Sequence, residues 1–209
     1  MSYLRDPAEI YRESFAAIAR EVDLSGFPDS LHKIVLRLVH SIAIPEIVED
    51  IAWDGDVAGA AKDALAKGAP IIVDANMVVA GIMKDRLSNG SEIKCFLRDE
   101  SVPELAQSLA TTRSAAAVEL WRPELEGAII SIGNAPTALF HLIDMLADKD
   151  CPRPAAIFAF PVGFIGAAES KAYLIEKELG IPFITLKGRM GGSALAAATV
   201  NAVLIGDSS

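Results

Sequence analysis

AIISIGNAPTAL, residues 128–139, is an apolar run that passes directly into a turn of small residues and then into a helical pattern. Two later stretches have the same order of patterns: AIFAFPVGFIGAAESK at 156–171 and FITLKGRMGGS at 183–193. Short apolar runs bounded by turn residues are typical of buried strands. Each stretch therefore predicts a strand, a tight turn and the start of a helix.

The same alternation begins earlier, near residue 70. Strands are expected at about 70–73 and 93–97, followed by helices at about 77–84 and 102–120. Five strands that alternate with helices predict right-handed crossovers and a parallel sheet covered on both faces. The expected α/β fold is a three-layer α/β/α, flavodoxin-like five-stranded parallel sheet, in which the turns after the strands share the carboxyl edge where ligands bind.

The N-terminal part is expected to be helical. Apolar residues recur at helical spacing after Pro7, a second helix is expected at about 31–42, and a short alanine-rich helix at 57–67 ends at a glycine. No internal repeat, low-complexity stretch or linker divides the chain. We therefore expect a single domain over 1–209, with an added helical segment at 1–68 and an α/β core at 69–209.

Composition limits the classes of protein that fit. The 209 residues are 52% hydrophobic and 22% charged, which is an ordinary globular composition, and the net charge of −9 argues against a general nucleic-acid binder. No apolar run approaches the roughly 18–20 residues of a membrane span, and the N-terminus lacks an apolar signal core. A cytoplasmic protein is expected. Neither the two cysteines nor the three histidines have metal-ligand spacing, so no metal site is expected.

Common nucleotide-binding signatures are missing. The sequence has no Gly-x-x-x-x-Gly-Lys-Ser/Thr loop and no Gly-x-Gly-x-x-Gly after a strand. The turn after the first expected strand reads Asp74-Ala75-Asn76, which does not fit the glycine-rich turn used for S-adenosylmethionine. ATP, NAD and S-adenosylmethionine are therefore not expected as ligands, and a flavodoxin-like nucleotide-binding module is the weakest of the alternatives.

The turns at the carboxyl edge predict a ligand site. Helix N-termini there direct amide N–H groups and positive dipole ends at the crevice, which suits carboxylates or phosphates. Any one of these turns is explained by ordinary turn chemistry, but several at one edge favour a site. The turns read Asp74-Ala75-Asn76, Arg98-Asp99, Gly133-Asn134, Pro161-Val162-Gly163 and Lys187-Gly188-Arg189.

His40 is the candidate for proton chemistry. Lys33, Arg37 and His40 fall at i, i+4 and i+7 and so share one helix face, and a histidine on a cationic face can act as an acid or base beside an anionic ligand. From spacing alone, a solvated surface histidine is the simpler interpretation, and His32 and His141 fit structural roles. Arg113, flanked by alanines, can reach a ligand carboxylate with its guanidinium or form a surface salt bridge.

Together these motifs resemble the precorrin-8X methylmutase family of cobalamin biosynthesis. The resemblance extends in order over nearly the whole chain. One departure is the run at 41–46, which is more apolar than the family pattern. The matching stretches are Tyr11-x-x-Ser14-Phe15, Arg37-x-x-His40, Asp74-x-x-Met77-Val78-x-x-Gly81-Ile82, Thr112-Arg113-Ser114, Gly133–Leu139, Pro161–Lys171 and Gly188–Asn201.

The resemblance implies an isomerase that moves the C-11 methyl group of precorrin-8X to C-12, giving hydrogenobyrinate, without a cofactor. It implies a homodimer with the ligand at the subunit interface and a catalytic acid/base at His40, and it makes handover of product to the next pathway enzyme plausible. The substrate carries acetate and propionate groups, which gives a reason for basic residues at the site. The residues expected at the substrate are Tyr11, Ser14, Arg37, Thr112, Arg113, Ser114, Gly133, Asn134, Ala135, Pro136, Thr137, Pro161, Val162, Gly163, Phe164, Lys171 and Arg189.

Two alternatives stay open at this point. A corrinoid-binding carrier would need the same pocket without turnover. An enzyme for the cobalt-containing form of the substrate would need the same residues, because nothing in the sequence marks the metal-free or the cobalt-containing substrate.

Overall fold

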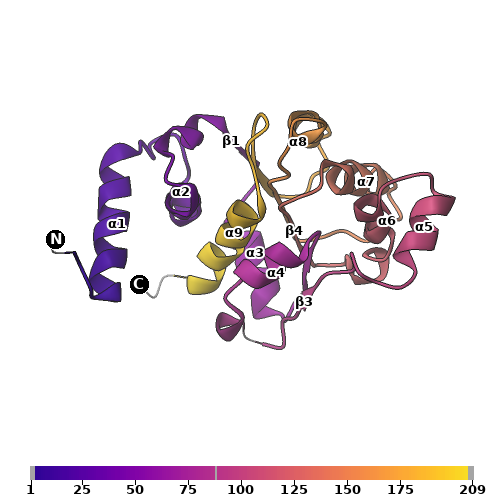
Figure 1. The fold of residues 1–209 in the computed structure, drawn as a ribbon, viewed down its shortest axis with the longest axis horizontal. Helices are drawn as coiled ribbons and strands as arrows, with labels where there is room; N and C mark the ends of the chain where they lie inside the picture. The colour runs from indigo at the N-terminus through magenta and orange to yellow at the C-terminus, as the bar shows by residue number, and fades with distance from the viewer. Residues whose placement is uncertain (1–2, 88, 207–209) are drawn as a thin grey trace.

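The computed structural model describes residues 3–87 and 89–206, and these form a mixed six-stranded sheet with helices on both faces (Figure 1). The sheet order is β1-β6-β5-β4-β2-β3, with β1 antiparallel to β6 and every other pair parallel. The strands are β1 (Ile51–Asp54), β2 (Ile71–Val73), β3 (Ile93–Lys94), β4 (Ile129–Ile132), β5 (Ala156–Ala159) and β6 (Phe183–Leu186).

The expected five-stranded, all-parallel sheet is wrong by one strand. β1 was missed, because its four residues have no clear alternation of apolar and polar side chains, and only its pairing with β6, with Ile51 opposite Leu186, defines it. The other strands lie where they were predicted, although β3 is shorter. Read in chain order, these parallel strands have the 2-1-3-4-5 order of flavodoxin-like sheets.

The helices follow the predicted pattern except at 102–120. There the chain forms two helices instead of one, because Ala110 has a left-handed backbone (φ 48°) and the Thr112 hydroxyl then caps the second helix. The helices are α1 (Pro7–Glu21), α2 (Asp29–Ile42), α3 (Val57–Ala66), α4 (Asn76–Gly81), α5 (Val102–Ser108), α6 (Arg113–Glu119), α7 (Pro136–Leu146), α8 (Ala167–Glu176) and α9 (Ser193–Ile205).

Two hydrophobic cores lie on opposite faces of the sheet. One joins the sheet to α2, α3, α4 and α9, and the other joins it to α6, α7 and α8. In α9 every residue from Leu195 to Val203 is buried, so this helix is central to the first core. None of the fifteen residues of α1, all of which are described, is buried; α1 lies outside α2 at the end of the molecule (Figure 1). In the described part of the chain, no helix has the length and apolar character needed to cross a membrane.

Candidate active site

His40 is held by a side chain from the neighbouring helix. It lies in the last turn of α2, and its ring Nδ1 is 2.9 Å from the Ser14 hydroxyl oxygen on α1. The Phe15 ring stacks on the imidazole, with 4.8 Å between centroids and 25° between planes. Both contacts come from α1, which packs beside α2. The imidazole ring is therefore fixed in orientation while the residue as a whole remains exposed.

Arg37 lies one turn before His40 and is buried, with 8% of its surface exposed. Its guanidinium donates a hydrogen bond to the Tyr11 hydroxyl and lies over the rings of Tyr11 and Phe15, 5.7 and 5.5 Å from their centroids. Burial first, and then the charge of Arg37, lower the pKa of His40 below its ordinary value of 6.5. At neutral pH the imidazole is therefore mainly neutral, and its protonated form is a stronger acid than a free histidine.

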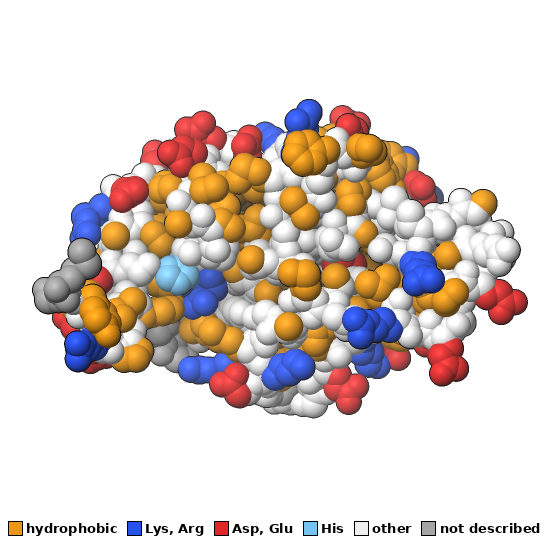
Figure 2. All heavy atoms as spheres, in the orientation of Figure 1, with side chains coloured by type: hydrophobic (Ala, Val, Ile, Leu, Met, Phe, Trp, Pro, Cys, Tyr) orange, Lys and Arg blue, Asp and Glu red, His pale blue; other side chains and the backbone are white. Residues whose placement is uncertain are grey.

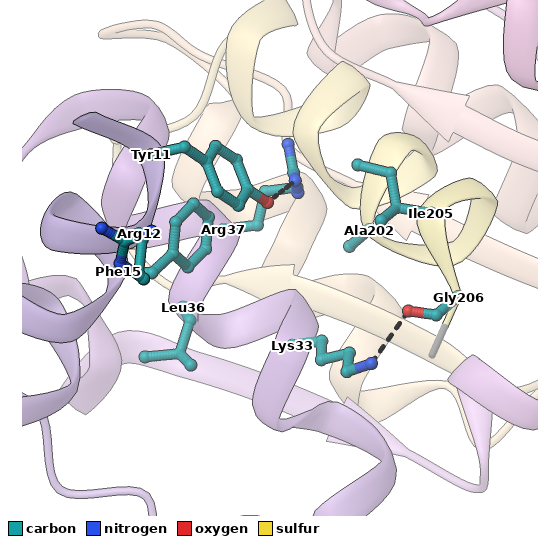
Figure 3. Close-up of a pocket in the computed structure, with 9 residues that line it drawn as sticks. All are labelled: Tyr11, Arg12, Phe15, Lys33, Leu36, Arg37, Ala202, Ile205 and Gly206. Atoms are coloured by element: carbon teal, nitrogen blue, oxygen red, sulfur yellow. Dashed lines mark hydrogen bonds between the residues drawn. The ribbon is translucent and has the colours of Figure 1, made fainter. Parts of the chain in front are cut away.

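Tyr11, Ser14, Phe15, Arg37 and His40 form what we call the His40 cluster. A cavity of about 430 Å³ opens beside it and is lined by three of these residues. Figure 3 shows Tyr11 and Phe15 reaching from α1 toward Arg37, while the Lys33 ammonium donates to the Gly206 carbonyl at 2.9 Å at the end of α9. The cavity thus combines apolar walls with cationic groups from α2. Its lining residues are Tyr11, Arg12, Phe15, Lys33, Leu36, Arg37, Ala202, Ile205 and Gly206.

The small-residue turns at the carboxyl edge are joined by backbone hydrogen bonds. The Val162 amide donates to the Asn134 carbonyl at 3.3 Å, and the Gly163 amide donates to the Arg189 carbonyl at 3.3 Å. The Gly192 amide donates to the Phe160 carbonyl at 2.7 Å. We call residues 133–137, 160–164 and 187–192 the carboxyl-edge platform, because these bonds connect three turns into one surface.

Asp74, which directly follows β2, lies under the carboxyl-edge platform. Its carboxylate accepts backbone N–H groups from Gly133 (2.8 Å), Asn134 (3.0 Å) and Ala135 (2.7 Å), and only 3% of the residue is exposed. Burial raises the pKa of this carboxyl group, and the N–H donors oppose that rise. Amides that were expected to bind a ligand anion are therefore occupied by a carboxylate of the protein itself, and sequence reasoning missed the role of Asp74.

Lys171, predicted at the substrate, has a hydrogen-bond partner within the protein. It is fully buried on α8, and its ammonium donates to the Met190 carbonyl in the carboxyl-edge platform. Burial lowers its pKa from 10.5 to about 8, and the charge of Asp50 partly opposes this. A lysine in this position supports the platform from beneath. Its predicted contact with the substrate stays a prediction.

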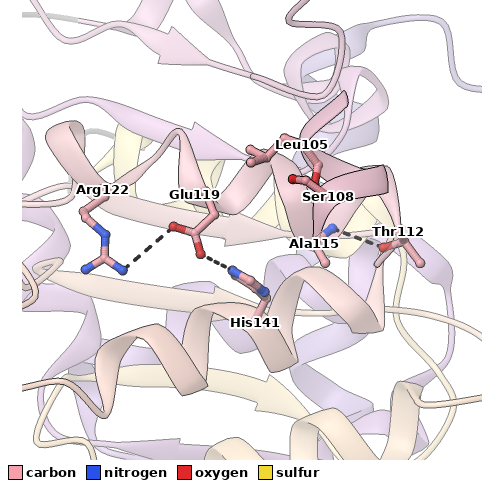
Figure 4. A network of polar contacts seen from close by, with 7 residues as sticks. All are labelled: Leu105, Ser108, Thr112, Ala115, Glu119, Arg122 and His141. Carbon is pink, nitrogen blue, oxygen red and sulfur yellow. Dashed lines mark hydrogen bonds and ion pairs between the residues drawn. The ribbon is translucent and has the colours of Figure 1, made fainter. Parts of the chain in front are cut away.

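Thr112, predicted at the substrate, is bonded to a second predicted site residue. Its hydroxyl lies 2.8 Å from the Thr137 hydroxyl and accepts the Ala115 amide at 3.2 Å, so it joins α6 to the start of α7. Arg113 is exposed and Ser114 is half-buried in the first turn of α6. Further along, Glu119 lies between His141, at 2.6 Å, and Arg122, at 3.9 Å (Figure 4), which supports the structural role predicted for His141.

Exposed apolar side chains lie on the carboxyl-edge platform and next to it. Phe164 is 86% exposed and Ile165 is 91% exposed, and Met77, Val162 and Met190 are exposed as well. The Arg189 guanidinium lies over the Phe164 ring, 5.6 Å from its centroid. Figure 2 shows hydrophobic side chains over the position of α8 and across the middle of the face in view. Large apolar groups this exposed are typical of surfaces that bind a ligand or another chain.

The remaining predicted residues are placed mainly as parts of the carboxyl-edge platform. Gly133, Ala135 and Pro161 are buried within it, whereas Asn134 is exposed and Pro136 is half-buried. Within residues 3–87 and 89–206, no group of three or more His, Cys, Asp or Glu side chains could hold a metal ion. The structure thus has two clusters of predicted residues, one around His40 and one at the carboxyl edge. Helix α9 extends between them, from the neighbours of Gly133 at its start to the cavity wall at Ala202.

A family model described as precorrin-8X methylmutase matches residues 9–205 of the chain. The chain belongs to the precorrin-8X methylmutase family. A precorrin-8X methylmutase of Pseudomonas aeruginosa is 47% identical over 203 residues, which are 97% of this chain and 97% of that protein. A cobalt-precorrin-8 methylmutase of Priestia megaterium is 37% identical, covering 95% of this chain and 88% of that protein.

Solved structures agree with the family assignment. The precorrin-8x methyl mutase of Thermus thermophilus matches with a TM-score of 0.82 and 33% identity, covering 93% of this chain and 95% of that one. The resemblance read from the sequence is confirmed, and membership of the family makes the chain an isomerase of cobalamin biosynthesis. The roles of the individual site residues stay predictions.

Proposed function

We propose that the chain moves the C-11 methyl group of metal-free precorrin-8X to C-12, giving hydrogenobyrinate. The proposed chemistry rests on the orientation of the His40 ring by the Ser14 hydroxyl. This pair lies beside the buried Arg37, which lines the cavity. The choice of the metal-free substrate is supported by identity: 47% to two relatives named precorrin-8X methylmutase, against 37% to the Priestia megaterium relative named for the cobalt form.

His40 acts as the acid and then the base. The Ser14 hydroxyl engages Nδ1, so Nε2 is the ring nitrogen that faces the substrate. Protonated His40 gives its Nε2 proton to the macrocycle, the methyl group shifts within the activated ring, and the same proton returns to Nε2. Because burial and Arg37 lower the pKa of His40, its protonated form transfers this proton readily.

The carboxyl-edge platform provides the second part of the site. Arg189 and Arg113 are exposed cations that can pair with acetate and propionate groups of the substrate. Val162 and Phe164 offer apolar contacts for the macrocycle. Binding between these groups and the His40 cluster would orient the ring and keep water from it, which lowers the barrier without any cofactor.

A second copy of the chain is the proposed cover for the exposed apolar residues. Phe164 and Ile165 are neighbouring large apolar residues with almost fully exposed side chains, which is unusual for the surface of a monomer. Burying them in a homodimer would place the substrate at the subunit interface. A cytoplasmic location, a single domain over 1–209 and handover of product to the next enzyme complete the proposal. Light scattering of purified protein that gives the mass of a monomer would remove the dimer from it.

The test is turnover under catalytic conditions. Purified protein at about one hundredth of the precorrin-8X concentration should convert all of the substrate, seen as the change to the hydrogenobyrinate absorption spectrum. His40→Asn, which keeps a polar group beside Ser14, should lower kcat by about 100-fold or more. His32→Asn is the matched control, because His32 lies at the other end of α2 and bonds to the Phe27 carbonyl.

The alternatives give different results in the same experiment. A carrier would produce a spectral shift that stops at one ligand per subunit. An enzyme for the cobalt form would leave precorrin-8X unchanged and convert cobalt-precorrin-8. Equal turnover by His40→Asn and the unchanged protein would remove His40 from the mechanism.

A further inference from the structure

We propose that Asp74 is a positioning residue, whose buried carboxylate acts as a built-in anion that holds the carboxyl-edge platform in its ligand-binding form. This inference rests on the proposed function and deepens it. Asp74 touches no substrate in this proposal. It acts through the turn between β4 and α7, and through that turn on the rest of the platform.

The contacts of Asp74 are specific to this turn. One carboxylate oxygen accepts the Gly133 amide, and the other accepts the amides of Asn134 and Ala135. These three N–H groups precede Pro136 at the start of α7, where the helix dipole favours a negative charge. A neutral side chain of the same size cannot accept all three bonds, so the site selects a carboxylate.

The turn held by Asp74 is closely packed against neighbouring helices at Gly133. A Cβ added to Gly133 would lie 2.7 Å from the Ser193 Cα, 2.8 Å from the Ala196 Cβ and 2.9 Å from a Val78 methyl carbon. The backbone of Gly133 therefore packs directly against α9 and α4 while its amide is fixed by Asp74. Packing and hydrogen bonding together determine one position for this turn.

The effect extends across the carboxyl-edge platform. The Asn134 carbonyl accepts a hydrogen bond from the Val162 amide, and the next amide, that of Gly163, donates to the Arg189 carbonyl. The chain of backbone bonds thus leads from the Asp74 carboxylate to the loop that carries the exposed Arg189. Because Asp74 occupies the turn amides, the substrate carboxylates must bind to side chains on the platform rather than to these N–H groups.

Asp74→Ala and Asp74→Asn test the inference together. Asp74→Ala removes all three acceptor contacts and should raise KM for precorrin-8X by about 100-fold, a loss typical of misplaced binding groups, with a smaller change in kcat. Formate at millimolar concentration should restore much of the lost affinity, because it fits the space left by the carboxylate. Asp74→Asn keeps one acceptor oxygen and should raise KM by about tenfold, with no response to formate because the amide fills that space.

Asp56→Asn is the matched control, because Asp56 also accepts a backbone amide, that of Gly59, but at the start of α3. It should leave KM unchanged, as should formate added to the original protein. A KM for Asp74→Ala equal to that of the original protein, or a folded Asp74→Ala that formate does not rescue, would overturn the inference. Should Asp74→Ala fail to fold, a normal KM in Asp74→Asn overturns it.

Failure of the proposed function is a separate result. The proposed function fails if the protein converts no precorrin-8X at all. In that case the binding of formate to Asp74→Ala would be measured by thermal unfolding. Formate should still raise the unfolding temperature of Asp74→Ala and leave that of the original protein unchanged. No such stabilisation would reject the built-in anion itself.

Discussion

Lys171→Met should change the pH dependence of folding stability in a defined direction. Burial lowers the pKa of Lys171 from 10.5 to about 8, so the folded protein loses this proton near pH 8 whereas the unfolded chain keeps it until about pH 10.5. Between these values the unfolded state binds more protons, and stability therefore rises with pH. Below about pH 8 the full cost of the buried ammonium is present.

The size of the effect follows from the two pKa values. Their separation corresponds to a total of about 3 kcal/mol, and integrating between about pH 7.5 and about pH 9.5 gives a gain of about 2 kcal/mol in the free energy of unfolding. Methionine has a similar length and does not titrate. The difference in free energy between the original protein and Lys171→Met therefore isolates this one group, since the other titrating groups cancel.

Urea unfolding at the two pH values measures this difference. The free energy of the original protein minus that of Lys171→Met should increase by about 2 kcal/mol from the lower to the higher pH. Lys177→Met is the control, because it makes the same replacement at an exposed lysine that directly follows α8. A difference for Lys171→Met that stays constant to within about 0.5 kcal/mol would show that the ammonium is not buried as described.

Three further predictions address the site and its surroundings. Ser14→Ala removes the hydroxyl bonded to the His40 ring. Because one hydrogen bond is lost, steady-state kinetics should show kcat lowered about five- to tenfold with little change in KM. An unchanged kcat would show that Ser14 has no role in catalysis. The kcat of the original protein should fall as pH rises through the pKa of His40, which lies below 6.5, and a pH profile that instead rises there would reverse its proposed protonation state. Gly133→Ala should lower the free energy of unfolding, measured with urea, by about 1–3 kcal/mol, because the Cβ of the new alanine would overlap three neighbouring atoms. A stability equal to that of the original protein would contradict the close packing at Gly133.

The parallel part of the fold could be predicted because its strands are local apolar runs. Ala156–Ala159 and Phe183–Leu186 are buried at every position, so their patterns needed no knowledge of their neighbours. β1 depends on its partner, since it lies at the edge of the sheet with only Ile51 buried, and only pairing with β6 defines the strand. The break before α6 was visible as a polar interruption at Thr111-Thr112, but the left-handed backbone of Ala110 carries no sequence signal.

The sequence indicated candidate residues for the site but not the side chains and backbone groups that they contact. His40 and Arg37 share a helix face by spacing, yet nothing in the spacing shows that α1 packs there and brings Ser14 to the imidazole. Lys171 was taken for a substrate contact because buried and exposed lysines look alike in a sequence. Asp74 had a usable signal, since a carboxylate that follows a buried strand beside a small-residue turn is well placed to accept its amides.

Helix α1 is weakly attached to the rest of the molecule, yet it supplies three residues of the His40 cluster. It buries none of its fifteen described residues; Tyr11, Ser14 and Phe15 contact side chains of α2, and Ile18 packs half-buried against the first core. Segments with little buried apolar surface open at a lower free energy than the core does. Detachment of α1 would uncover the imidazole and remove one wall of the cavity while leaving the sheet intact. Amide hydrogens in α1 should therefore exchange with solvent sooner than those of α9, and bound ligand should slow that exchange.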